Sequence, residues 1–408
     1  MNFKRSGLII KTSLLSVLVG ILAGLFITIF LYALEIASTF RDGHLQVIYF
    51  LPLAGLIIVL LYHYADKISA QGNNLIIQKS IRPRGFLPLL MSPLIFVTTI
   101  ITHLFGGSAG REGVAVQLGA SGSDYISRWL KLEAKEKKVL LIVGAGAGFG
   151  AAMNTPLAGA IFGMEVLRRS GLKFAYLLQA LVGSFSAYGI SLLLKAPHPD
   201  YIRVTVESYF NFKIIGIVLV SSLLFGLSAR LFIYLHLQII KLYQKLNIHD
   251  FAKPLIGGGI LVLCFVWEGS YLYIGLGLET IQYAMENPVG FQVFVLKIIF
   301  TAITLASGFK GGEFTPLVFI GVTLASFIST QVGVPIELIA SLGFAAVFAS
   351  ASKTPIACSI MACEIFGFGI LPYVLASCFI ATLVCGKASI YKNQIGYETP
   401  PIVSFKAR

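Results

Sequence analysis

Charged residues are scarce in this chain. Asp, Glu, Lys and Arg make up 12% of its 408 residues, whereas apolar residues make up 57%. It also lacks a long polar stretch. Its most polar segments are short, and examples are 131–138 and the tail from 387. A soluble domain of this size would need a more polar surface, so the composition indicates a polytopic membrane protein. We expect one transmembrane domain over 1–408, without a cytoplasmic regulatory domain.

Acidic residues are fewer than basic ones, with 18 Asp and Glu against 31 Lys and Arg, which gives a net charge of +13. In a soluble protein this excess would suggest a nucleic-acid partner, but no basic stripe interleaved with aromatics occurs on a polar segment. The basic residues cluster at the ends of apolar runs, a pattern typical of cytoplasmic anchoring. These clusters lie at 4–11, 79–84, 131–138, 168–169 and 387–392.

Cysteine and histidine are too few and too scattered to predict a metal centre. The five cysteines lie in or beside apolar runs, and no two of the six histidines have a ligand spacing such as i, i+4. Buried cysteines of this kind usually behave as small apolar residues. We therefore expect no metal, no cofactor and no disulfide.

The first long apolar run covers 12–39 and can cross a bilayer as a tilted helix. It is too long for the core of a signal peptide, and no small-residue cleavage site follows it. We expect a retained first span, followed by further apolar helices along nearly the whole chain. The predicted fold class is an all-α polytopic membrane protein.

The chain contains an internal repeat. "GSAGREGVAVQLG" (107–119) and "GFKGGEFTPLVFIG" (308–321) both read Gly-x-x-Gly-x-Glu before an apolar run that ends in Gly. "NTPLAGAIFGME" (154–165) and "KTPIACSIMACE" (353–364) match in the same order and at nearly the same spacing. We predict a first repeat over 12–205 and a second over 212–395. The motifs alone leave open whether the repeats are parallel or inverted.

Duplicated membrane units are typical of transporters, which bind substrate near mid-membrane at the N-termini of broken helices. Glycines before each Glu motif predict a turn that leads into a helix, where unpaired N–H groups face an anion. A third polar break, "AQGNNLIIQ" (70–78), has no copy in the second half.

Four carboxylates stand out in the repeated motifs. Glu112 is either a first-turn residue paired with Arg111 or an intramembrane gate and proton carrier, and Glu313 occupies the equivalent position. We interpret Glu165 and Glu364 as helix-end residues near the membrane interface.

An enzyme is the alternative from a different class. "GGSAG" (106–110) fits the Gly-x-Ser-x-Gly nucleophile pattern, and His103 is close in sequence. That pattern needs a strand–turn–helix context, which two flanking apolar helices do not provide. We keep an intramembrane serine hydrolase, with Ser108 as nucleophile, only as a remote alternative.

At these residues the sequence resembles the CLC family of anion channels and proton-coupled antiporters. "GREGV" (110–114) resembles the family's GREGP motif, with Val114 in place of proline, and "GGEFTP" (311–316) resembles its GGxFxP motif. The segments 144–166 and 350–365 resemble the Gly/Ala-rich helices that follow each motif. The resemblance implies an inverted repeat of tilted, broken helices and a homodimer with one pathway per subunit.

Three departures from chloride-type members resemble the fluoride-exporting branch. Asn73 stands where chloride-type members carry a serine that faces the anion, and Val166 stands at their internal proton-transfer glutamate. Glu313 occupies a position that is usually apolar. Whether Val166 relocates the internal proton route to Glu313 or removes it stays open.

The resemblance implies a fluoride/proton antiporter in the plasma membrane that confers fluoride resistance and is not an enzyme. A chloride/proton antiporter or passive anion channel is the alternative within the family. Glu112 and Glu313 would serve gating and proton transfer. Tyr397 is a weaker candidate than Tyr391 for the anion-facing tyrosine. The anion would be lined by Asn73, Gly110, Arg111, Gly113, Val114, Phe314, Thr315 and Tyr391.

Overall fold

The computed structural model of the chain describes residues 2–81, 85–167, 174–205, 212–392 and 394. Within them, sixteen α-helices and four short 3-10 turns form the molecule, without a β-strand. The predicted all-α class is confirmed.

The helices of the first half are α1 Asn2–Gly43, α2 Leu51–Tyr64, α3 Asn73–Ile81, α4 Met91–Leu104, α5 Glu112–Trp129, α6 Ala134–Met153, α7 Pro156–Val166 and α8 Leu177–Leu193. Those of the second half are α9 Phe212–Lys245, α10 Ala252–Glu268, α11 Leu278–Glu286, α12 Phe291–Ala306, α13 Phe314–Val332, α14 Ile336–Ser352, α15 Pro355–Phe366 and α16 Leu371–Cys385. The 3-10 turns are η1 Leu45–Phe50, η2 Ser69–Gln71, η3 Phe174–Tyr176 and η4 Phe368–Ile370.

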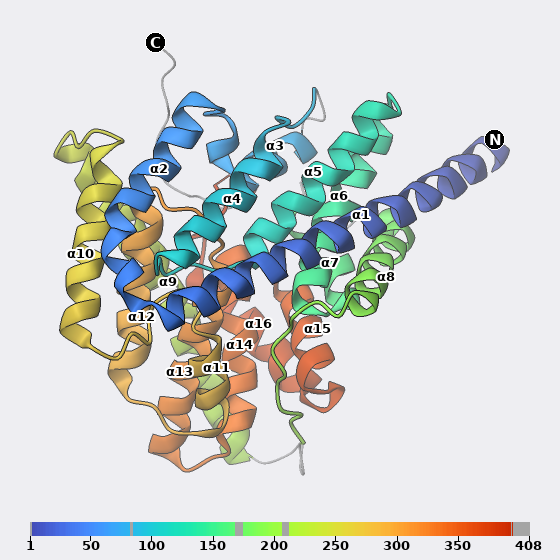
Figure 1. Cartoon of the computed structure of the whole chain (residues 1–408). Coiled ribbons are helices and arrows are strands. Elements are labelled where there is room, and N and C mark those ends of the chain that lie inside the picture. Colours follow the sequence, from blue (N-terminus) through green and yellow to red (C-terminus); the bar gives the residue numbers. More distant parts are fainter. Residues whose placement is uncertain (1, 82–84, 168–173, 206–211, 393, 395–408) are drawn as a thin grey trace.

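Helix α1 contains the predicted first span, 12–39, and extends beyond it at both ends. Its apolar part, Ile9–Gly43, has 35 residues. At about 1.5 Å per residue it is about 50 Å long, whereas the hydrocarbon core of a bilayer is about 30 Å thick. The helix must therefore cross obliquely, and Figure 1 shows it running diagonally over its neighbours.

Four more segments are long and apolar enough to span a membrane, and several shorter apolar helices accompany them. The four are Leu45–Tyr64, Phe212–Lys245, Phe314–Val332 and Phe368–Cys385. The chain is thus a multi-pass membrane protein.

Helices α4–α8 of the first half and α12–α16 of the second half contain corresponding close helix crossings. A Cβ added at Gly119 would lie 2.1 Å from the carbonyl oxygen of Gly144, so α5 touches the backbone of α6. A Cβ added at Gly321 would lie 2.0 Å from the carbonyl oxygen of Gly343, where α13 crosses α14. These crossings need glycine because any side chain would collide with backbone.

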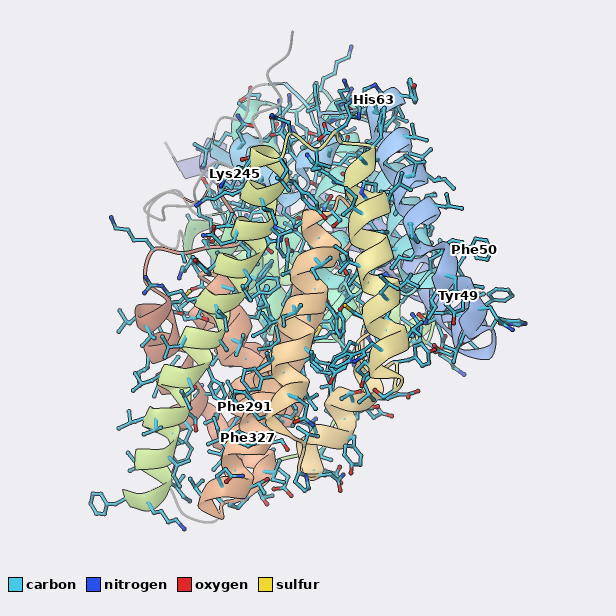
Figure 2. The ribbon with its side chains drawn as sticks, turned by 90° about the vertical axis from the view of Figure 1, so that its left-hand side faces the viewer. Tyr49, Phe50, His63, Lys245, Phe291 and Phe327 are labelled. Carbon is cyan, nitrogen blue, oxygen red and sulfur yellow. The ribbon has the colours of Figure 1, made fainter. Side chains whose placement is uncertain are left out.

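These two sets of helices also run in opposite directions. Helix α5 leads toward the end of the molecule at which α1 starts, whereas α13 leads toward the opposite end (Figure 1). Figure 2 shows both ends of the molecule. Phe291 and Phe327, which lies on α13, mark the end toward which α13 leads, and His63 and Lys245 mark the other end. The arrangement is an inverted repeat, as the family resemblance implied, while the boundaries 12–205 and 212–395 stay a prediction.

Candidate anion and proton site

The two glycine-rich loops meet in the interior. Gly110 donates its N–H to the carbonyl oxygen of Gly312 at 2.6 Å, and Gly312 returns the bond to Gly110 at 2.7 Å. A Cβ at Gly110 would lie 3.0 Å from that same oxygen and 3.0 Å from the backbone nitrogen of Thr315. The glycines therefore allow the start of α5 and the start of α13 to lie against each other.

Both helices begin without a side-chain cap. Arg111 at the start of α5 and Glu313 at the start of α13 make no capping hydrogen bond. The first N–H groups of a helix have no partner inside it, and the helix dipole gives them a positive field. Two such starts facing one place form an anion-binding arrangement.

The Thr-Pro helices α7 and α15 differ, because carboxylates close their starts. Glu364 of α15 accepts the N–H groups of Leu157 and Ala158 at 2.9 and 2.7 Å. Glu165 of α7 accepts those of Ile356 and Ala357 at 3.3 and 2.8 Å. Each glutamate thus caps the helix of the other repeat.

Glu165 and Glu364 lie near helix ends, as predicted, and their position relative to the membrane interface stays a prediction. Glu165 is fully buried and Glu364 is half-buried, and the motifs did not predict that each would cap the other repeat. A buried carboxylate needs partners of this kind, and four backbone N–H groups provide them.

We expect Glu364→Ala to lower the free energy of unfolding by about 2 kcal/mol, because two N–H groups of α7 would lose their acceptor. Thermal unfolding of the purified protein in detergent measures this change. Glu286→Ala, an exposed carboxylate at the end of α11, is the matched control and should leave the unfolding temperature unchanged. Equal unfolding temperatures for both variants would contradict a capping role.

Glu112 is buried and lies on one side of the glycine bridge. Its carboxylate accepts the hydroxyl hydrogen of Thr315 at 2.6 Å and the N–H of Arg111 at 3.2 Å. The Arg111 Nε atom lies 3.4 Å from the other carboxylate oxygen. Glu112 is thus held by one residue of its own loop and one of the other repeat.

A cavity of about 280 Å³ opens beside Glu112. The loop after α8 supplies part of its wall through His198, Tyr201 and Arg203. The sequence motifs did not predict these three residues. The only sequence signal for this wall was a polar stretch between two apolar helices. Other lining residues are Arg111, Glu112, Asn154, Phe314, Thr315, Phe344 and Glu364.

Asn73 and Glu313 both approach Gly113 and are not among the residues that line this cavity. A Cβ added at Gly113 would lie 3.2 Å from Asn73 Nδ2 and 3.7 Å from Glu313 Oε2, so both groups approach the same glycine. Asn73 begins α3 directly after Gly72, whose φ of 54° makes the turn at the predicted polar break. The buried Oδ1 atom of Asn73 has no hydrogen-bond partner.

The aromatic candidates differ in their surroundings. Phe314 lines the cavity and packs edge-on against Phe348, with ring centres 4.5 Å apart. Tyr391 is buried after α16. Tyr201 lines the same cavity as Glu112. Tyr397 lies outside the described residues.

Val114 does not fit the predicted anion contact. Its N–H already donates to the carbonyl oxygen of Arg111 at 3.1 Å, and its side chain is fully buried among apolar residues of α1, α4 and α6. This valine packs the first turn of α5 and has no free donor for an anion.

The serine-hydrolase geometry is absent from the described residues around Ser108. The Ser108 hydroxyl contacts the hydroxyl of Thr301 at 2.9 Å. Both ring nitrogens of His103 face backbone carbonyl oxygens, those of Thr99 at 2.9 Å and Ala109 at 3.0 Å. No histidine therefore activates this serine.

Comparison with known proteins agrees with this arrangement. Residues 53–386 match the model of the voltage-gated chloride channel family. A chloride/fluoride channel protein of Pseudomonas syringae pv. tomato is 35% identical, over 95% of this chain and 86% of its own length. A H⁺/Cl⁻ exchange transporter of Vibrio cholerae is 27% identical, over 89% of this chain and 84% of its own.

Solved structures are similar as well. The crystal structure of a CLC-type fluoride/proton antiporter has a TM-score of 0.91 at 34% identity, with 96% of this chain and 98% of that chain covered. A slow cyanobacterial Cl⁻/H⁺ antiporter shares the fold, with a TM-score of 0.76 at 20% identity over 92% of this chain and 94% of its own.

Proposed function

Because the chain belongs to the CLC family of voltage-gated chloride channels, we propose that it is a fluoride/proton antiporter and not an enzyme. One observation carries the proposal: two uncapped helix starts meet at the Gly110–Gly312 bridge, with Glu112 at a cavity and with Asn73 and Glu313 close to Gly113. The similarity to a fluoride/proton antiporter supports fluoride as the anion.

We further propose that the protein lies in the plasma membrane as a homodimer and exports fluoride while protons flow inward. The end at which α1 starts also carries the basic turn between α5 and α6, and cytoplasmic ends of membrane proteins are enriched in Lys and Arg. This orientation makes the cavity beside Glu112 the outer one, because α5 runs from Glu112 toward the cytoplasmic end. The dimer and its lipid contacts come from the family resemblance alone.

Glu112 is the proposed gate. As a carboxylate it competes with the anion for the N–H groups at the helix starts, since both are negative charges that accept hydrogen bonds. As a neutral acid, Glu112 is attracted less strongly to these N–H groups and can leave the anion-binding position free. Thr315 and Arg111 hold the conformation in which Glu112 borders the outer cavity.

Glu313 is the proposed inner proton carrier. Glu313 and Asn73 both approach Gly113. The position of Glu313 is usually apolar in chloride-type members. The anion path would pass Asn73, the backbone of Gly113, and the side chains of Thr315, Phe314 and Tyr391. Gly110 was also predicted to line the anion, but its N–H is bonded to the carbonyl oxygen of Gly312 and is no more a free donor than that of Val114.

Fluoride suits a compact site of this kind. It is small and strongly hydrated, so a site must replace its water with strong donors. The amide of Asn73 and the free N–H groups can do so. A protonated carboxylic acid also donates to fluoride, whereas an ionised one repels it, which links the two ions.

We expect Asn73→Ser to lower the ratio of fluoride flux to chloride flux by about tenfold, because the amide that faces Gly113 and Glu313 would be lost. Parallel flux measurements in proteoliposomes give the ratio. Asn247→Ser, in the turn after α9, is a control away from the site and should leave the ratio unchanged. An unaltered ratio in Asn73→Ser would remove Asn73 from the selectivity site.

Efflux from proteoliposomes, recorded with a fluoride electrode and a chloride electrode in parallel, tests the substrate directly. The proposal predicts fluoride efflux well above chloride efflux. Equal fluxes of the two ions would favour a chloride antiporter or a passive anion channel of the same family.

A further inference from the structure

Lys310 is a charged residue of the loop before α13 that the proposed function leaves unused. Its Nζ atom donates to the carbonyl oxygen of Ala70 at 3.2 Å and lies 4.6 Å from the centre of the Tyr62 ring. Its backbone N–H donates to the hydroxyl of Thr102 at 3.3 Å. A carbonyl dipole and an aromatic face both stabilise an ammonium group, so these contacts favour a positive Lys310 inside the protein.

Lys310 is connected to both Asn73 and Glu313. Ala70 belongs to η2, which continues through Gly72 into Asn73. The hydrogen bond from Lys310 Nζ to Ala70 therefore holds the turn that positions the Asn73 side-chain amide. In the other direction Lys310 stands three residues before Glu313, and the two charges attract each other. Among the described residues, no carboxylate oxygen lies within 4.0 Å of Lys310 Nζ.

Charge balance gives this arrangement a consequence. With Glu313 ionised, Lys310 and Glu313 are neutral as a pair, and a fluoride beside Asn73 adds an uncompensated negative charge. With Glu313 protonated, the same fluoride neutralises Lys310. In a weakly polar interior, charges interact more strongly than they do across water, so the second state binds fluoride better.

We propose that fluoride and the Glu313 carboxylate compete for the positive charge of Lys310, so that fluoride binding beside Asn73 is accompanied by proton uptake at Glu313. This inference rests on the proposed fluoride function and makes Lys310 a residue of the inner anion site. The other titratable groups near this site are Tyr62, whose ring lies under Lys310 Nζ, Asp66, which is bonded to Ser69 of η2, and Lys392, whose N–H is bonded to Asn74, together with Tyr391 and Glu112.

Calorimetric titration of the detergent-purified full chain with sodium fluoride tests the competition. A Glu112→Gln background removes the outer carboxylate, and buffers of different ionisation heat report the protons taken up with each fluoride. We expect proton uptake with each fluoride bound, up to one proton where Glu313 begins ionised, by the linkage between proton and ligand binding. Adding Glu313→Gln should abolish this uptake.

Lys310→Gln keeps a donor for the Ala70 carbonyl oxygen but loses the charge. In the same background we expect at least about tenfold weaker fluoride binding and little proton uptake, because the positive charge for which fluoride and Glu313 compete is gone. Lys310→Arg should restore both. Lys297→Met is the matched control, since Lys297 also donates to backbone carbonyls and lies over a ring, that of Phe319, yet touches neither Asn73 nor Glu313.

The outcomes separate this inference from the function on which it rests. Fluoride affinity and proton uptake that persist in Lys310→Gln would overturn the inference and leave the fluoride function intact. Absence of fluoride binding in the unmodified chain would overturn the proposed function, and the inference with it. If Lys310→Gln fails to fold, proton uptake that survives Glu313→Gln still overturns the competition.

Discussion

Glu112→Gln is expected to reduce fluoride-driven proton transport by about 100-fold, the scale on which a positioned proton-transfer group acts. Glutamine has the shape of glutamate and can still accept the Thr315 hydroxyl bond. It cannot release a proton or compete as an anion for the free N–H groups of α5 and α13. The coupling should therefore fail while the fold persists.

Proton uptake into proteoliposomes under an imposed fluoride gradient measures this effect. Glu279→Gln provides a matched control, because Glu279 is an exposed carboxylate in the first turn of α11 and should keep the transport rate of the unmodified chain. If fluoride still drives protons through Glu112→Gln, Glu112 is not the gate.

Gly312→Ala is expected to lower the flux of both ions by about 100-fold, since overpacking at a fixed backbone contact costs about 3 kcal/mol. The added Cβ would lie 2.8 Å from the backbone nitrogen of Gly113, which cannot yield as a flexible side chain does. The collision would push apart the starts of α5 and α13 and disturb the bonds between Gly110 and Gly312.

Gly259→Ala on α10 is the control for this substitution, because no atom lies within 4 Å of a Cβ added there. Both variants are compared for flux and for elution as a folded protein in detergent. Normal fluoride flux through Gly312→Ala would mean that the close approach of the two loops is not needed for transport.

Local sequence signals were sufficient for the fold class and for the start of each key helix. The glycine-rich turn before Glu112 predicted the beginning of α5, and the same pattern at Glu313 predicted α13, because glycine turns and N-terminal carboxylates act within a few residues. The break at Gly72 and Asn73 was predicted on the same grounds.

Contacts between distant segments could not be predicted in this way. The bonds from Glu165 to α15 and from Glu364 to α7 join residues about 200 positions apart, and each motif alone gives no reason to choose the other as partner. The wall of the outer cavity around His198 and Tyr201 depends on how the loop after α8 folds back over Glu112. Val114 was misassigned because the resemblance of motifs does not reveal which N–H groups are already bonded.

Proton movement driven by a halide gradient tests the central claim most directly. Proteoliposomes with the membrane potential clamped at zero receive an outward gradient of fluoride or an equal gradient of chloride, with no initial pH difference. The account predicts that fluoride drives protons inward until a pH gradient forms, and that chloride drives far fewer. Equal proton movement with both halides, or none with fluoride, would contradict it.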